Sequence, residues 1–174
     1  MKTHISLLRG INVSGQKKVK MEELKKLYES LGFKDVQAYI QSGNVVFRSS
    51  EAGSILAGRI EKKVREYFRF EVFVLIRTKD DLQKLIKKNP FSKKDIDKLY
   101  VTFLSGYPAM PPLEELNKAK AAEEFFISGR EIYLFCPDGY GKTKLSNNFF
   151  ERKLKLHATT RNWKIVNKLL ELSK

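Results

Sequence analysis

The chain has 174 residues, which is enough for one ordinary domain or two small ones. Its 42% hydrophobic and 31% charged residues are typical of a soluble globular protein, and no apolar run approaches the roughly 20 residues that a membrane helix needs. A single cysteine, Cys136, excludes an internal disulfide framework and predicts a reducing, cytoplasmic environment. The short apolar stretch at the N-terminus is broken by Arg9, which predicts a first strand rather than a signal peptide.

The strongest bulk feature is a net charge of +14, from 34 Lys and Arg residues against 20 Asp and Glu residues. The excess is +9 over residues 1–88 and +5 over residues 89–174, so it is not a basic tail. Such a field attracts polyanions, which predicts a nucleic acid, a phosphorylated metabolite or an acidic protein as the partner. The alternative is that the 25 lysines serve mainly solubility. Charge alone leaves both interpretations open.

The first half of the chain reads as strand, helix, two strands, helix and strand. Apolar residues recur at helical spacing from Leu24 to Leu31, and Gly32 would stop that helix. A hairpin follows, in which β-branched and aromatic residues flank a Ser-Gly turn at Ser42-Gly43. The predicted elements are a strand over 4–13, a helix over 21–31, a hairpin over 35–49, a helix over 55–68 and a strand over 71–77.

The second half has the same order, after a helix over 80–88 that Asn89-Pro90 would stop. Its hairpin also carries a Ser-Gly pair, at Ser128-Gly129. The predicted elements are a strand over 99–104, a helix over 113–124, a hairpin over 125–136, a helix over 145–156, a short strand over 158–161 and a closing helix over 162–172.

Short matches between the halves recur in one order. Residues 7–10 match 103–106, the two Ser-Gly pairs match, and residues 61–64 match 151–154. We therefore predict an α+β fold of two tandem ferredoxin-like (βαββαβ) units plus a C-terminal helix, produced by duplication. A single mixed sheet with chance similarity is the alternative. The predicted domains are a first unit over 1–78, a helical connector over 79–98 and a second unit with its closing helix over 99–174.

Four multi-residue motifs in this order resemble a known family. They are LLRGINV at 7–13, YIQSGNVVF at 39–47, CPDGYG at 136–141 and TTRNW at 159–163. The chain resembles, over essentially its whole length, a bacterial family catalogued as domain of unknown function 1697. That resemblance implies the two-unit α+β fold and a cytoplasmic bacterial origin. It implies no activity, so function has to be argued from the residues.

The first hairpin offers a candidate binding surface. With Ser42-Gly43 as a two-residue loop, one set of its side chains would lie on the sheet face that ferredoxin-like helices leave open. Amide, phenol and guanidinium groups on such a face suit hydrogen bonds to bases or phosphates. The alternative is that this face is packed between the two units. The side chains on the predicted open face are Gln37, Tyr39, Gln41, Asn44 and Arg48.

Two loops, each between a strand and a helix, combine glycines with lysines. Residues 10–17 have the glycine spacing of a phosphate-binding loop but lack its lysine, and residues 139–143 lack its first glycine, so neither is a Walker loop. Free N–H groups at a helix start beside Lys142 and Lys144 still favour an anion, which Arg161 would also reach. A flexible turn is the alternative for the second loop.

Two further features have mainly structural interpretations. Tyr133 and Phe135 share one face of a strand, as base stacking requires, but the glycine-and-aromatic pattern of an RNA-recognition strand is absent, which favours core packing. Thr160 or Asn162 is predicted to cap the closing helix.

Enzyme signals are few, so an enzymatic activity is left undecided. No Cys/His spacing predicts a metal site, and no cofactor is predicted. Our first hypothesis is a non-catalytic binder of an anionic ligand, foremost a nucleic acid. The alternatives are a small enzyme acting on a phosphorylated substrate in a cleft between the units, and a protein-interaction module. The candidate ligand-binding residues are Arg9, Asn12, Lys17, Gln41, Asn44, Arg48, Lys142, Lys144, Arg161 and Asn162.

Overall fold

The computed structural model describes residues 1–174 and forms two compact α+β units. The first unit comprises Met1–Lys84 together with Lys168–Lys174, and the second comprises Leu85–Asn167. The two-unit α+β prediction is confirmed. The compact units do not coincide with the predicted boundaries, because the helix predicted as a connector is divided between them and the end of the closing helix belongs to the first unit.

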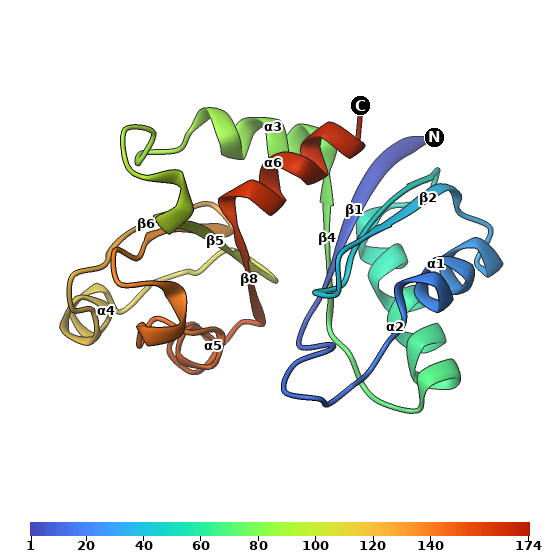
Figure 1. Cartoon of the computed structure of the whole chain (residues 1–174), viewed down its shortest axis with the longest axis horizontal. Helices are drawn as coiled ribbons and strands as arrows, with labels where there is room; N and C mark the ends of the chain where they lie inside the picture. Colours follow the sequence, from blue (N-terminus) through green and yellow to red (C-terminus); the bar gives the residue numbers. More distant parts are fainter. The chain divides into compact units, whose positions relative to one another are not determined.

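The first unit contains a four-stranded antiparallel sheet in the order β2-β3-β1-β4. Two helices lie on one side of this sheet (Figure 1). The chain leaves the first strand earlier than predicted, at Leu8, because Gly10 turns it with a φ of +74°. The elements are β1 (Lys2–Leu8), α1 (Met21–Ser30), β2 (Lys34–Tyr39), β3 (Asn44–Ser49), α2 (Gly53–Phe68), β4 (Val74–Thr78) and α3 (Lys79–Lys87).

The core of the first unit lies between its sheet and α1 and α2. Leu24, Leu27 and Tyr28 face inward from α1, and Leu56, Ile60 and Val64 face inward from α2, as the helical spacing predicts. They pack on Leu8, Val45, Phe47 and Val74 of the strands. Burying each such side chain contributes about 1.5–3 kcal/mol, so this layer supplies much of the stability of the unit.

The second unit repeats this arrangement with a sheet in the order β6-β7-β5-β8. Its core joins Leu116 of the first helix and Phe150 of the second to Leu104, Ile132 and Leu134 of the strands. The elements are β5 (Leu99–Leu104), α4 (Leu113–Ala119), β6 (Glu124–Ser128), β7 (Glu131–Phe135), α5 (Asn147–Leu154), β8 (Ala158–Asn162) and α6 (Trp163–Leu172), with short 3-10 turns at Ile96–Lys98 and Tyr140–Lys142.

The helix predicted over 113–124 is shorter in the structure. It ends at Ala119, because the backbone of Lys120 is extended and the Glu123 carboxylate accepts a hydrogen bond from the Ala121 N–H. The residues that follow are therefore free to begin the edge strand β6.

Equivalent hydrogen bonds relate the two units to each other residue by residue. The Glu61 carboxylate accepts from the Val74 N–H at 3.0 Å, and the Glu151 carboxylate accepts from the Ala158 N–H at 3.1 Å. In each unit a helix carboxylate therefore fixes the first residue of the last strand. Within the predicted match of residues 61–64 with 151–154, this confirms the pair Glu61 and Glu151.

The turns of the two hairpins differ from the prediction and from each other. In the first, Tyr39 pairs with Asn44, so the turn has four residues rather than Ser42-Gly43 alone. The Asn44 amide closes it by donating to the Tyr39 carbonyl and to Ser42 Oγ. A Cβ on Gly43 would lie 2.6 Å from Ile11 Cδ1, so this position requires glycine.

In the second hairpin Ser128 pairs with Glu131, and the two-residue turn is Gly129-Arg130. The Leu8 N–H donates to the Gly43 carbonyl, and the Leu104 N–H donates to the Arg130 carbonyl. Gly43 is therefore the counterpart of Arg130, and the predicted match of the two Ser-Gly pairs is wrong.

One residue of β2 has no counterpart in β6. Lys34 pairs with Arg48 and Gln37 with Val46, which leaves two residues of β2 opposite the single residue between Val46 and Arg48. Of these two, Val36 points into the core, as Phe125 does in β6. The inserted residue is Asp35, which adopts a left-handed φ of +50°.

Among the helices, none is long and apolar enough to cross a membrane.

Candidate functional site

The face of the first sheet opposite α1 and α2 is not the open platform that the hairpin pattern predicted. Ile5, Leu7, Val46 and Asn44 on this face are at most 2% exposed. The strands carry apolar side chains on both faces, and the middle of this face is buried. Base stacking across the middle of this sheet is therefore excluded.

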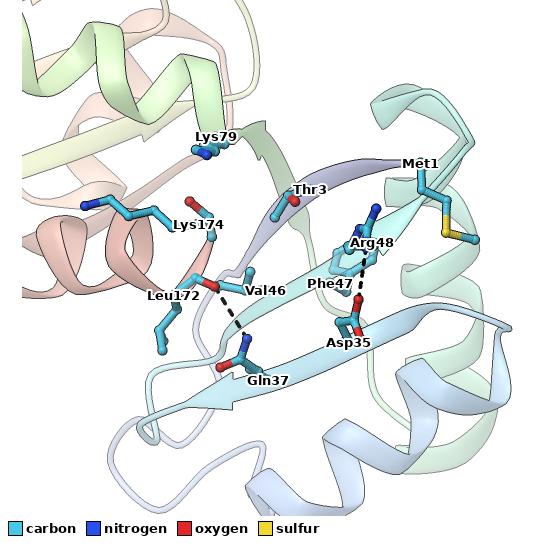
Figure 2. A pocket seen from close by; sticks show the side chains of 11 residues that line it. Met1, Thr3, Asp35, Gln37, Val46, Phe47, Arg48, Lys79, Leu172 and Lys174 are labelled. Carbon is cyan, nitrogen blue, oxygen red and sulfur yellow. Dashed lines mark hydrogen bonds and ion pairs between the residues drawn. The ribbon is translucent and has the colours of Figure 1, made fainter.

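A pocket of about 510 Å3 lies at one end of this face (Figure 2). Its walls include Thr3 from β1, Gln37 from β2, Arg48 from β3 and Lys79 from the first turn of α3. Residues from the end of α6 line it as well, and the Gln37 amide donates to the Leu172 carbonyl over a long 3.4 Å. The pocket is thus built from β1, β2, β3 and α3 together with the C-terminal segment Lys168–Lys174, all of which belong to the first unit.

The inserted residue Asp35 and the predicted ligand residue Arg48 meet in this pocket. Arg48 Nη1 lies 3.3 Å from Asp35 Oδ2, and their side chains are 47% and 66% exposed. An exposed pair of this kind contributes only about 0.2–1 kcal/mol, because water screens it. A ligand can therefore rearrange the pair at small cost.

The charged side chains around the pocket are mainly basic. Arg48, Lys79 and Lys174 carry positive side chains, and Asp35 carries the one acidic side chain of the lining. Figure 2 shows Arg48 and Lys79 on opposite sides of Thr3, with the Lys174 side chain extending away from Arg48. A group bound above Thr3 would therefore meet a positive charge from either side, which favours an anion.

Most predicted ligand residues near the first loop have structural roles. The Asn12 amide donates to the Val19 and Gln41 carbonyls, and its oxygen accepts from the Val19 N–H, so Asn12 joins this loop to the hairpin turn. The Lys17 ammonium donates to the Glu71 carbonyl at 2.7 Å. Asn44 is fully buried in the turn. The backbone N–H of Arg9 donates to the Phe73 carbonyl, and Arg9 is half-buried.

The predicted basic group of the second unit does not converge on one point. Lys142 and Lys144 are exposed, and Tyr140 beside them stacks on Tyr100 at 5.1 Å between ring centroids, on the core side of the sheet. Arg161 lies on the opposite face of the sheet from Tyr100. There it is buried and donates to Thr159 Oγ1 and the Thr160 carbonyl.

Three side chains singled out in the second unit are explained by packing. The Asn162 side chain accepts from the Ile165 N–H and caps α6, as predicted. Tyr133 is buried and its hydroxyl donates to the Leu85 carbonyl at 2.7 Å, which agrees with a core role. Burial raises the pKa of the Cys136 thiol to about 12, so this side chain is not the thiolate that a nucleophile requires.

The corner of the second unit that corresponds to the pocket is apolar. The register of the two sheets and the positions of the buried arginines, Arg77 and Arg161, define the correspondence. Four polar positions of the pocket are replaced by apolar residues. Thr3, Gln37, Arg48 and Lys79 correspond to Leu99, Phe126, Phe135 and Trp163.

Sequence reasoning found Arg48 and Gln37 but missed Thr3, Asp35 and Lys79. The sequence contains a signal for Asp35. Two residues of β2, Lys34 and Asp35, precede the inward-facing Val36, whereas one residue of β6 precedes the inward-facing Phe125. Lys79 had no such signal. It reaches the pocket only because α3 begins directly where β4 ends.

Comparison with known proteins bears on the family and the fold. The family model described as "Protein of unknown function (DUF1697)" matches residues 1–133. The chain is also similar to the solved structure of the conserved bacterial protein SP0830 from Streptococcus pneumoniae, with 25% sequence identity and a TM-score of 0.74. That match covers 99% of each chain, so the elements of both units have counterparts in a solved structure. No curated protein matches the sequence significantly.

Proposed function

We propose that this chain, which belongs to the family described as protein of unknown function (DUF1697), is a non-catalytic binding protein for a phosphate-bearing ligand. The ligand would occupy the pocket of the first unit. The observation that carries the proposal is the placement of Arg48 and Lys79 on opposite sides of Thr3 in a hollow of about 510 Å3. The proposal includes the cytoplasmic location that the single cysteine predicts.

The dimensions and donors of the pocket support this ligand class. Small-molecule sites commonly measure about 300–1,000 Å3, which accommodates a nucleotide or a smaller phosphate ester. The Arg48 guanidinium matches the oxygens of a phosphate in its planar fork, and the Lys79 ammonium adds a compact positive charge. The Thr3 hydroxyl can donate a further hydrogen bond.

The phosphate can come from a nucleic acid or from a free metabolite. The net charge of +14 supports attraction of a polymer, while the limited volume of the pocket and its lack of exposed aromatic rings support a single phosphate group at a time. A terminal phosphate of a strand and a mononucleotide share this chemistry.

The test is fluorescence anisotropy over a salt series with three labelled probes. They are a single-stranded RNA with a 5′-phosphate, the same RNA with a 5′-hydroxyl, and a mononucleotide. We expect both phosphate-terminated probes to bind in competition with each other, and Arg48→Ala or Lys79→Ala to weaken that binding about tenfold. The matched control is Lys62→Ala, an exposed lysine on α2 at the other face of the sheet.

Each outcome separates the hypotheses. Equal binding of both RNAs, insensitive to Arg48→Ala, would assign polymer binding to the general surface charge and overturn the pocket. Absence of binding by every probe at physiological salt would overturn the proposal altogether. Release of inorganic phosphate from the bound mononucleotide would replace the binder with the enzyme that the sequence left as an alternative.

A further inference from the structure

We infer that the pocket of the first unit selects a zwitterionic ligand, one that carries a positively charged amine beside its phosphate group. This inference rests on the proposed function and specifies its ligand class. The structural basis is Asp35, whose carboxylate lies among the basic groups of the pocket and is paired with Arg48 at 3.3 Å.

Asp35 is placed in the pocket by an insertion. The second unit shows that this fold forms an edge strand without the extra residue, because β6 pairs with β7 in continuous register. In the first unit the insertion forces Asp35 into a left-handed conformation with a φ of +50°, which L-residues adopt at a cost. The result is a carboxylate directed at Arg48, in a pocket that has no counterpart in the apolar corner of the second unit.

A purely anionic ligand would disturb this arrangement. If its phosphate takes Arg48, Asp35 loses its partner and lies within a few ångströms of the new negative charge. A phosphate that carries an ammonium group avoids this conflict, since the phosphate pairs with Arg48 and Lys79 while the ammonium replaces Arg48 as the partner of Asp35. Arg48 and Asp35 each exchange one ionic partner for another, and no covalent bond is formed between ligand and protein.

The exposure of the pair makes the exchange feasible. Both side chains are between 47% and 66% exposed, so neither is locked by packing, and the pair is screened by water in the free protein. Gln37 supports the same wall, because its amide is directed to the Leu172 carbonyl and its oxygen remains an acceptor for a ligand amine.

The experiment compares two ligands that differ in one group. O-phosphoethanolamine and n-propyl phosphate have the same number of non-hydrogen atoms, with an ammonium in the first where the second has a methyl. Both are titrated into the full chain and followed by 1H–15N NMR. We expect O-phosphoethanolamine to bind about fivefold more tightly, which is what an exposed ion pair supplies.

The deciding variant is Asp35→Asn, with Lys62→Ala as the control. Asparagine tolerates the left-handed conformation, so the bulge is retained while the charge is removed. We expect the preference to disappear in Asp35→Asn, because propyl phosphate binds more tightly and phosphoethanolamine more weakly. If both ligands bind the wild-type chain with equal affinity, and Asp35→Asn raises the affinity for both, the preference for a zwitterionic ligand is overturned. The proposed phosphate pocket would stand. Absence of binding by both ligands, or binding insensitive to Arg48→Ala, would overturn the proposed function itself.

Discussion

The two units of this chain share a common frame, meaning their strand order and the contacts that fix their last strand, and they differ at the end of the sheet where the pocket lies. Each has the same strand order, the same helix carboxylate that fixes the last strand, and the same buried arginine one residue before a helix-capping side chain. Thr78 caps α3 through its hydroxyl, and Asn162 caps α6 through its amide oxygen. These shared features are therefore the ones that we assign to the stability of each unit.

The corners at the end of the two sheets differ at four polar positions that line the pocket. Thr3, Gln37, Arg48 and Lys79 of the first unit are replaced in the second by Leu99, Phe126, Phe135 and Trp163, with the Lys94 ammonium 5.0 Å from the centroid of the Phe135 ring. The second unit shows that the fold does not need a polar corner. The polar corner of the first unit consequently has a reason other than folding, which supports placing the ligand there.

The largest effect expected from the comparison concerns Gly43 and Arg130, which occupy equivalent positions in the two hairpin turns. Gly43→Ala places a Cβ 2.6 Å from Ile11 Cδ1 at a φ of +82°, so we expect a loss of about 2–4 kcal/mol of unfolding free energy. Arg130→Ala is expected to change it by less than about 1 kcal/mol. Urea denaturation followed by circular dichroism measures both. Similar losses for the two variants would contradict the assignment of the turns.

The second effect concerns the carboxylates that fix β4 and β8. We expect Glu61→Ala and Glu151→Ala each to cost about 1–2 kcal/mol, because each leaves a partly buried N–H without its acceptor. Glu61→Gln keeps an acceptor oxygen and is the matched control, with a loss below about 0.5 kcal/mol expected. The same denaturation measurement applies. A loss in only one unit would show that the two hydrogen bonds are not equivalent in energy.

The frame was predictable because its signals are local and repeated. Helical spacing from Leu24 to Leu31 and the apolar strands predict these elements directly, and the same order of elements occurs in both halves of the sequence. The hairpin turns were assigned wrongly because a Ser-Gly pair is compatible with turns of two and four residues. The contact of Gly43 with Ile11 and Leu8 decides between them, and that contact joins residues 32 and more positions apart.

The pocket was only partly predictable for a related reason. Arg48 was found because it lies on a recognisable hairpin, but its partner Asp35 belongs to a bulge, which breaks the alternation on which the prediction of faces depends. The sequence leaves open whether this face is exposed or packed, because residues far along the chain, such as Leu172, lie against part of it.

A smaller expected effect is a dependence of stability on pH that arises in the first unit and not at the equivalent position of the second. His4 on β1 is 2% exposed and stacks on Phe47, and the equivalent position of the second unit is Tyr100. Burial lowers the pKa of His4 from its ordinary 6.5, partly offset by the backbone of Ser49. Below pH 6.5 the unfolded chain takes up a proton that the folded chain resists, so stability is lost as the pH falls from 6.5 toward the folded pKa.

For one proton this loss cannot exceed about 1.4 kcal/mol per pH unit. His4→Phe keeps a ring on Phe47 and removes the titration, so we expect the unfolding free energy of this variant to depend less on pH between 7 and 5. Denaturation series at several pH values compare the two slopes. Parallel pH profiles for wild type and His4→Phe would show that other groups cause the acid sensitivity.

The smallest effect on stability is expected from deleting Asp35 altogether. The deletion gives β2 the continuous pairing of β6, with Lys34 still opposite Arg48 and Gln37 still opposite Val46. Removing a left-handed residue is expected to stabilise the strand, whereas removing the exposed ion pair is expected to destabilise it by about 0.2–1 kcal/mol. We therefore expect a net change in unfolding free energy within about 1 kcal/mol. Denaturation measures the change, and the titration with phosphoethanolamine and propyl phosphate measures ligand preference in the same sample. A stable chain without the preference would show that the insertion serves the ligand, whereas a loss of more than about 3 kcal/mol would show that the bulge is needed for folding and would remove the reason to assign Asp35 to the pocket.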